Sequence, residues 1–173
     1  MPRFKITIQY DGTKFFGWQI QPSKRTVQGE LEKVISSFSD GEKIKVFGAG
    51  RTDTGVHALS QVAHFDLKTD LDTCSLIKAM NANLSEDILI ESLDVVPANF
   101  HARYSAQLRY YRYQCYTGNN VLFRNQSWIT GQLDQSILQS VAETVVGEHD
   151  FLSFCKFRID MKSTVCKIYE SVW

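Results

Sequence analysis

The chain has 173 residues, a formal net charge of zero, and no CxxC pair among its four cysteines. This length suits one domain or two small ones, and the scattered cysteines are typical of reduced thiols rather than a disulfide framework or a metal site. No run of about 18 apolar residues exists to form a membrane-spanning helix, and the N-terminus lacks the apolar block of a signal peptide. We expect a soluble cytoplasmic protein that recognises any nucleic-acid partner through local charge.

The first hundred residues alternate between strand and helix patterns. Alternating or β-rich runs predict strands at Phe4–Tyr10, Ile44–Phe47, Gln61–Phe65 and Ile88–Val96. Helical spacing of apolar residues predicts a helix after an N-cap at Thr26, and a second helix over Leu71–Met80 with Asp72 or Thr73 as its cap. The resulting order β-α-β-β-α-β is the split βαβ, or ferredoxin-like, pattern of the α+β class.

A second, incomplete round of the same pattern begins near His101. A long strand is predicted over Ala106–Tyr116, a helix over Asp134–Val146 closed by Gly147, and a final strand over Thr164–Trp173. We therefore expect two domains, residues 1–100 and 101–173, with the last pieces of the second one missing.

The stretch Gly48–Ala58 is the strongest candidate for an active-site loop. Its three glycines give the backbone freedom to approach a ligand, and between them stand Arg51, Thr52 and Asp53. Three roles are open for Asp53: the cap of a helix beginning after Gly55, a metal ligand, or a nucleophile or general base aligned by Arg51. The metal role is disfavoured because no second carboxylate or His–His pair stands at ligand spacing. His57 either orients this loop or contacts the substrate.

A basic and aromatic segment narrows the substrate class. From Pro97 through Gly131 the chain has no Asp or Glu, and it carries four arginines and eight aromatic residues. The arginines are Arg103, Arg109, Arg112 and Arg124. Cations interleaved with aromatic rings supply the phosphate contacts and stacking faces that hold an unpaired nucleotide. The alternative is a half-buried strand with tyrosines on one face and arginines in solvent.

Taken in order, the motifs of this chain resemble those of the TruA family of tRNA pseudouridine synthases along essentially its whole length. They are Tyr10-Asp11-Gly12, Phe16-Gly17-Trp18-Gln19, Thr26-Val27-Gln28, the loop Gly50-Arg51-Thr52-Asp53 with Gly55-Val56-His57, Asn81-Ala82-Asn83-Leu84, Phe100-His101-Ala102-Arg103-Tyr104 and Tyr111-Arg112-Tyr113.

The resemblance implies a fold, an activity and a set of site residues. The fold would be two ferredoxin-like halves that share one antiparallel sheet, in a homodimer that clamps tRNA. The activity would be isomerisation of uridine to pseudouridine in the tRNA anticodon arm (tRNA positions 38–40), without a cofactor or a metal. Asp53 would be the nucleophile, Arg51 would help to flip the uridine, and Tyr111 would stack on it. Attack at C1′, attack at C6 and a glycal route all stay open.

Family members continue beyond the point that corresponds to Trp173, with a further active-site segment. We therefore expect this chain to be C-terminally shortened, with reduced or absent turnover. The alternative function is a tRNA-binding protein without catalysis, in which RNA contacts by His57 and the four arginines persist while the chemistry is lost.

Overall fold

Residues 1–155 and 163–173 are described by this computed structural model, and they divide into two units, residues 1–112 and 113–173. The predicted boundary near residue 100 stays a prediction. Among the described residues, no helix has the length and hydropathy needed to cross a membrane.

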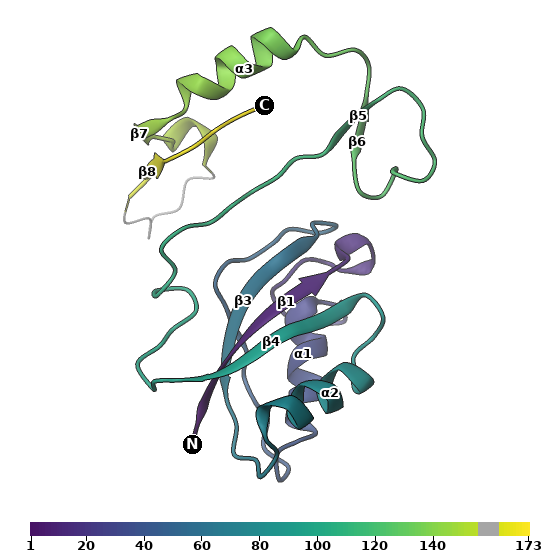
Figure 1. Cartoon of the computed structure of the whole chain (residues 1–173), viewed down its shortest axis with the longest axis vertical. Coiled ribbons are helices and arrows are strands. Elements are labelled where there is room, and N and C mark those ends of the chain that lie inside the picture. The colour runs from purple at the N-terminus through teal and green to yellow at the C-terminus, as the bar shows by residue number, and fades with distance from the viewer. Residues whose placement is uncertain (156–162) are drawn as a thin grey trace. The chain divides into compact units, whose positions relative to one another are not determined.

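A four-stranded antiparallel sheet organises the N-terminal unit (Figure 1). Its strands are β1 (Arg3–Tyr10), β2 (Phe47–Gly48), β3 (Ala58–Asp66) and β4 (Ile88–Val96), in the spatial order β2-β3-β1-β4. The helices α1 (Val27–Ser36) and α2 (Thr73–Asn83) lie on the same side of this sheet (Figure 1). The chain is thus α+β with an antiparallel sheet, as expected for the fold class.

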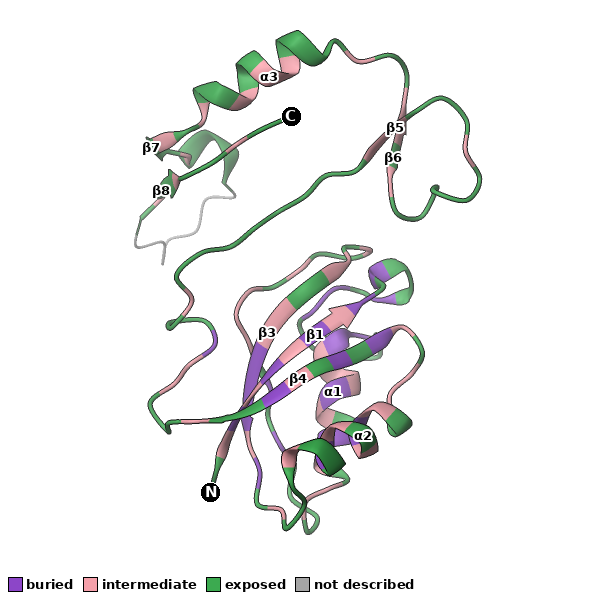
Figure 2. Cartoon of the chain, viewed as in Figure 1, coloured by how far each residue is buried: buried purple, intermediate pink, exposed green. Residues whose placement is uncertain are grey.

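Strict alternation along β1 builds the core on the helix side of the sheet. Phe4, Ile6, Ile8 and Tyr10 are buried, whereas the residues between them are only partly buried. They pack with apolar residues of α1, α2 and β4 in one cluster, which includes Leu31, Ile35, Leu76, Met80 and Ile90. Figure 2 shows that the buried positions gather in this unit.

The predicted helix caps of both N-terminal helices are confirmed. The side chain of Thr26 accepts a hydrogen bond from the Gly29 amide at the start of α1, and that of Asp72 accepts one from Ser75 at the start of α2. Each cap satisfies an amide that has no partner within its own helix.

The strand predicted over Ile44–Phe47 is wrong in its extent, since β2 covers only Phe47–Gly48. Ile44 and Val46 are buried as the pattern indicates, but their amides donate to side chains of α1 instead of to a neighbouring strand. The Ile44 amide donates to Ser36 Oγ at 2.9 Å, and the Val46 amide to Glu32 Oε1 at 3.0 Å. Apolar alternation reports burial, whereas a strand also needs a backbone partner.

The C-terminal unit contains short elements. They are β5 (Cys115–Thr117), β6 (Trp128–Thr130), α3 (Gln135–Thr144), β7 (Gly147–Asp150), the 3₁₀ turn η2 (Leu152–Phe154) and β8 (Val165–Ile168). Strands β5 and β6 pair in parallel, and β7 and β8 pair antiparallel. The predicted helix over Asp134–Val146 is present as α3, and the side chain of Asp134 caps its start. No described residue of this unit is buried.

Two predicted strands of this region are wrong in their extent. The expected strand over Ala106–Tyr116 is limited to Cys115–Thr117, and that over Thr164–Trp173 to Val165–Ile168. Tyrosines and alternation favour an extended backbone, but residues 106–113 find no strand to pair with among the described residues. The predicted sheet shared between two halves stays a prediction.

An ion-pair cluster fastens the segment after β1 to the rest of the unit. The Arg25 guanidinium bonds both oxygens of Asp87 at 2.7 and 2.8 Å and lies 4.1 Å from the centre of the Phe15 ring. Hydrogen bonds from Arg25 are the main cause that lowers the pKa of Asp87 from 3.8 to about 2. The Asp87 carbonyl also accepts from the Asp11 amide at 3.0 Å.

Replacing this carboxylate should make the protein less stable at neutral pH. The pKa of Asp87 is lower in the folded state, so its stabilising contribution of about 2 kcal/mol is present above pH 4 and is lost as the pH falls towards 2. Asp87→Asn should therefore lower the free energy of unfolding by about this amount at pH 7, and by much less at pH 2. Urea denaturation across this pH range measures both values.

Asp70→Asn is the matched control, because Asp70 is exposed and has no partner among the described residues. A pH-independent cost of Asp87→Asn, or an equal cost in the control, would contradict the role of the Arg25–Asp87 pair.

Candidate active site

The active-site loop predicted over Gly48–Ala58 connects β2 to β3, with residues 49–57 between the two strands. It turns at Thr54–Gly55, where Gly55 has a φ of +81° and the Val56 amide donates to the Asp53 carbonyl at 3.2 Å. The chain then enters β3 at Ala58, and no helix begins after Gly55. The interpretation of Asp53 as a helix cap is therefore wrong.

Main-chain and side-chain hydrogen bonds fix the backbone of this loop to the end of β1 and to the segment that follows it. β1 ends at Tyr10, directly opposite Ala58, so the segment that follows β1 lies beside the loop that precedes β3. The Trp18 amide donates to the Thr52 carbonyl at 3.0 Å, and the Gly55 amide to the Phe15 carbonyl at 3.2 Å. The Tyr10 hydroxyl, whose pKa is raised by burial, shares a hydrogen bond of 2.9 Å with Thr52 Oγ1.

The two segments approach so closely that two glycines are required. A Cβ on Gly12, which begins the 3₁₀ turn η1 (Gly12–Lys14), would lie 2.0 Å from the Val56 carbonyl oxygen. A Cβ on Gly17 would lie 2.5 Å from the Thr52 carbonyl oxygen, and Gly17 also has a φ of +83°. Because the obstructing atoms are backbone, no side-chain rotation relieves either clash.

Asp53 and Arg51 are both exposed at the outer side of the anchored loop. Among the described residues, the Asp53 carboxylate has no hydrogen-bond or ion-pair partner, and it does not pair with Arg51. The loop keeps its shape through Thr52, Gly55 and Val56, so the carboxylate is not needed to tie down backbone amides. The Asp53 carboxylate oxygens are therefore accessible to a ligand.

His57 fastens the end of the loop to the start of η1. Its Nδ1 accepts a hydrogen bond from the Gly12 amide at 3.2 Å and lies 3.1 Å from Asp11 Oδ1. Asp11 is itself held by Thr13, whose hydroxyl and amide both donate to it and lower its pKa. The structure thus supports the loop-orienting role that the sequence left open for His57.

The basic and aromatic segment starts on the face of the sheet opposite the helices. Arg3 of β1 forms a two-point ion pair with Asp66 and donates to the carbonyls of Ala98 and Phe100 at 2.6 and 2.8 Å. His64 of β3 is 2% exposed, and its Nδ1 accepts from the Ala102 amide at 3.1 Å.

Burial lowers the pKa of His64, and the charges of His101 and Arg3 act in the same direction. The neutral ring keeps Nδ1 free to accept from Ala102. It stacks with Phe47 at 5.1 Å between ring centres and contacts the His101 ring at 4.6 Å in a tilted arrangement. His64 is therefore a structural residue that holds residues 100–104 against the sheet.

The structure brings some of the predicted site residues together. Arg51, Asp53 and His57 share the loop, and Arg109 reaches it, since its Nη2 donates to the Ala49 carbonyl at 2.9 Å. Three predicted residues in the following chain are exposed, with Tyr111 at 81%. They are Arg103, which lies 5.7 Å from the Tyr104 ring centre, Tyr111 and Arg112. Arg124 is exposed between β5 and β6 in the C-terminal unit.

The residues that support the loop had no assigned role in the sequence analysis. Gly12, Gly17 and Trp18 stood there only as parts of motifs, and Tyr10 also as the end of a predicted strand. All four contact the Asp53 loop. The sequence did hold a signal for this contact. Gly12 and Gly17 lie outside the predicted strands and helices, on either side of Phe15 and Phe16.

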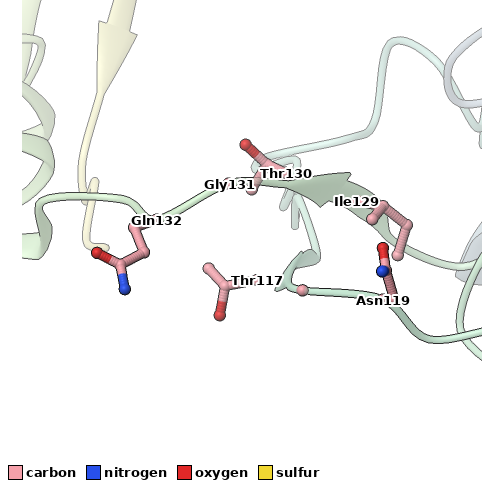
Figure 3. Close-up of a pocket in the computed structure, with 7 residues that line it drawn as sticks. Thr117, Asn119, Ile129, Thr130, Gly131 and Gln132 are labelled. Atoms are coloured by element: carbon pink, nitrogen blue, oxygen red, sulfur yellow. The ribbon is translucent and has the colours of Figure 1, made fainter.

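An open hollow lies elsewhere, in the C-terminal unit (Figure 3). It has a volume of about 620 Å³ and is lined by residues 117–119 and 129–132. None of these is a predicted site residue. Among the described residues, no three His, Cys, Asp or Glu side chains gather to hold a metal ion.

Comparisons with known proteins give an independent line of evidence. Residues 6–105 match the family model described as tRNA pseudouridine synthase. The chain is 43% identical over 172 residues to the tRNA pseudouridine synthase A of Geobacillus sp. (strain WCH70), which covers 98% of this chain and 69% of that protein.

Other relatives carry the same name. The chain is 44% identical over 178 residues to the protein of Dictyoglomus turgidum, covering 100% of this chain and 72% of the relative. It is 43% identical over 173 residues to that of Maridesulfovibrio salexigens, covering 98% and 64%. The chain is thus shorter than each of these relatives.

Gly17→Ala should cost more stability than Gly41→Ala, and the difference measures the close approach of the two segments. Both glycines have a φ near +84°, but a Cβ on Gly41 would meet nothing within 4 Å. The left-handed backbone alone should cost about 1–2 kcal/mol at each site. The clash with Thr52 should add about 1–3 kcal/mol at Gly17.

Chemical denaturation of the two variants measures these free energies of unfolding. Equal costs would show that the loop moves away freely, which would contradict a loop fixed by its backbone.

Proposed function

Because this chain belongs to the tRNA pseudouridine synthase family, we propose that it isomerises uridine to pseudouridine in tRNA, with Asp53 as the nucleophile. The single observation that carries the assignment of Asp53 is an exposed carboxylate without a partner among the described residues, on a loop that is held by its backbone. A structural carboxylate would spend its oxygens on amides or cations.

The isomerisation balances without an oxidant or a second substrate. The bond between C1′ of the ribose and N1 of the base breaks, the base turns, and a bond between C1′ and C5 forms. The proton on C5 is released, and N1 ends up protonated. A carboxylate suits this sequence because it attacks an electrophilic carbon and then leaves. Attack at C1′, attack at C6 and elimination to a glycal each meet this balance.

Arg51 and Tyr111 would handle the everted nucleotide. Taking a uridine out of its stack costs a few kcal/mol. A guanidinium that occupies the vacated space and an aromatic ring that stacks on the base would each recover part of that cost. Support comes from their availability, since Arg51 and the Tyr111 ring are exposed in the N-terminal unit that carries Asp53.

The wider assembly is part of the same proposal. The order β1-α1-β2-β3-α2-β4 supports a ferredoxin-like N-terminal half. We extend the proposal to a second such half on a shared sheet, to a homodimer, and to the tRNA anticodon arm as the substrate, all of which the family resemblance implies. Arg103, Arg112 and Arg124 would contact its phosphates, and their exposure is consistent with this role.

Replacing Asp53 should separate chemistry from binding. With protein in excess over tRNA that carries tritium at C5 of uridine, the 173-residue chain should release tritium, and Asp53→Asn should lower the single-turnover rate by at least about 10³-fold. The affinity for tRNA should change little, because the substitution keeps the size of the side chain and removes no cation. Filter binding measures that affinity.

Two outcomes would contradict this proposal. If Asp53→Asn keeps its rate, Asp53 is not the nucleophile. If the unchanged chain binds tRNA but releases no tritium, the binding-only alternative holds for it.

Removing a phosphate contact should change how tRNA binding depends on salt. Arg112→Ala or Arg124→Ala should each weaken binding and reduce the slope of log K against log salt by about 1. Lys33→Ala removes an equal charge from the exposed side of α1 and should leave the slope unchanged. An unchanged slope in the arginine variants would exclude those residues from the RNA contact.

A further inference from the structure

Arg109 differs from the other three arginines of its segment because it has a defined partner in the active-site loop. Its Nη2 donates to the Ala49 carbonyl at 2.9 Å, and its Nε would lie 3.7 Å from a Cβ built on Gly50. The guanidinium therefore lies along the backbone at the start of the loop, four residues before Asp53.

This hydrogen bond is the one tie in an otherwise unpaired stretch. Among the described residues, no other residue from Ala106 to Arg112 makes a hydrogen bond, and none of them belongs to a strand. Upstream, the chain is held by Arg3 and His64 as far as Ala102, and by the Ser105 amide, which donates to the His101 carbonyl at 2.8 Å. Beyond Ser105, the path of the segment depends on Arg109.

We infer that Arg109 is a positioning residue that holds the segment bearing Tyr111 against the Asp53 loop, and not an RNA contact; this inference rests on the proposed function. Tyr111 follows two residues later, within about 7 Å of Arg109 along an extended backbone. Its ring is 81% exposed, so packing does not fix it. The tie to Ala49 therefore sets where the stacking ring stands relative to the carboxylate.

An arginine suits this task better than a lysine. The planar guanidinium loses less freedom for each hydrogen bond formed than a flexible ammonium does. A lysine still reaches a carbonyl as a single donor, so Arg109→Lys should recover part of what Arg109→Ala loses. If Arg109 instead contacted an RNA phosphate, Arg109→Lys would keep that contact, because lysine also neutralises a phosphate.

The first test uses the protein without RNA. Hydrogen–deuterium exchange of peptides covering residues 49–57 reports the Ala49, Gly55 and Val56 amides, which are hydrogen-bonded in the loop. Arg109→Ala should speed this exchange by about 3–10-fold, because a hydrogen bond from a charged donor is lost. Arg112→Ala is the matched control, since Arg112 is in the same segment and has no partner among the described residues. Unchanged exchange in Arg109→Ala would overturn the inference.

The second test separates positioning from phosphate contact. Arg109→Ala should lower the single-turnover rate of tritium release at saturating tRNA while leaving the salt slope of tRNA binding unchanged, and Arg109→Lys should restore part of the rate. A salt slope reduced by about 1 in Arg109→Ala would assign Arg109 to the RNA contact and overturn the inference.

The two proposals fail in different ways. The exchange experiment contains no RNA, and the salt slope needs binding but no turnover. Absence of tritium release from the unchanged chain would therefore refute the proposed function, while the role of Arg109 as a tie is still decided by exchange and salt dependence.

Discussion

The geometry of the site depends on a contact between two backbones. The segment after β1 lies against the loop before β3 so closely that Gly12 and Gly17 have no room for a Cβ. Backbone hydrogen bonds between Trp18 and Thr52 and between Phe15 and Gly55 close this contact. The loop is shaped by main-chain atoms, by the side chains of Thr52 and His57, and by donors from outside the loop. Among the described residues, the side chains of Arg51 and Asp53 take no part in holding it. A carboxylate can then be held in place and still be free to react.

The sheet supports this site from both of its faces. On the helix side, the alternating residues of β1 build the core that fixes the strand ends. On the other side, Arg3 and His64 hold the chain that leads to the basic and aromatic segment. The basic and aromatic segment then reaches the loop at Ala49, whose carbonyl accepts a hydrogen bond from Arg109. The residues proposed to stack on the base and to react thus come from distant parts of the sequence but depend on one framework.

Sequence patterns identified the parts of this framework that are encoded locally. The full extent of Ile88–Val96, the caps at Thr26 and Asp72, and the loop around Asp53 all follow from periodicity or from local residue chemistry. The failures have a common cause, which is that a strand needs a partner. The amides of Ile44 and Val46 bond α1 side chains, and residues 106–113 find no strand among the described residues. The contacts of Gly12, Gly17 and Arg109 join residues 35 to 60 positions apart, which no local window contains.

The charge pattern bears on how such a protein holds RNA. With zero net charge, long-range attraction to a polyanion is weak, and under the proposed function the phosphate contacts would come from the acid-free stretch between Pro97 and Gly131. If Arg109 is committed to a carbonyl, three exposed arginines are left in that stretch, which limits its share of the salt slope to about −2 to −3. Phosphate contacts of that number orient an RNA more than they retain it. Under the proposed function, the free energy that keeps a uridine out of its stack would then come from Arg51 and Tyr111, so the placement of these two side chains would matter more than the net charge of the segment.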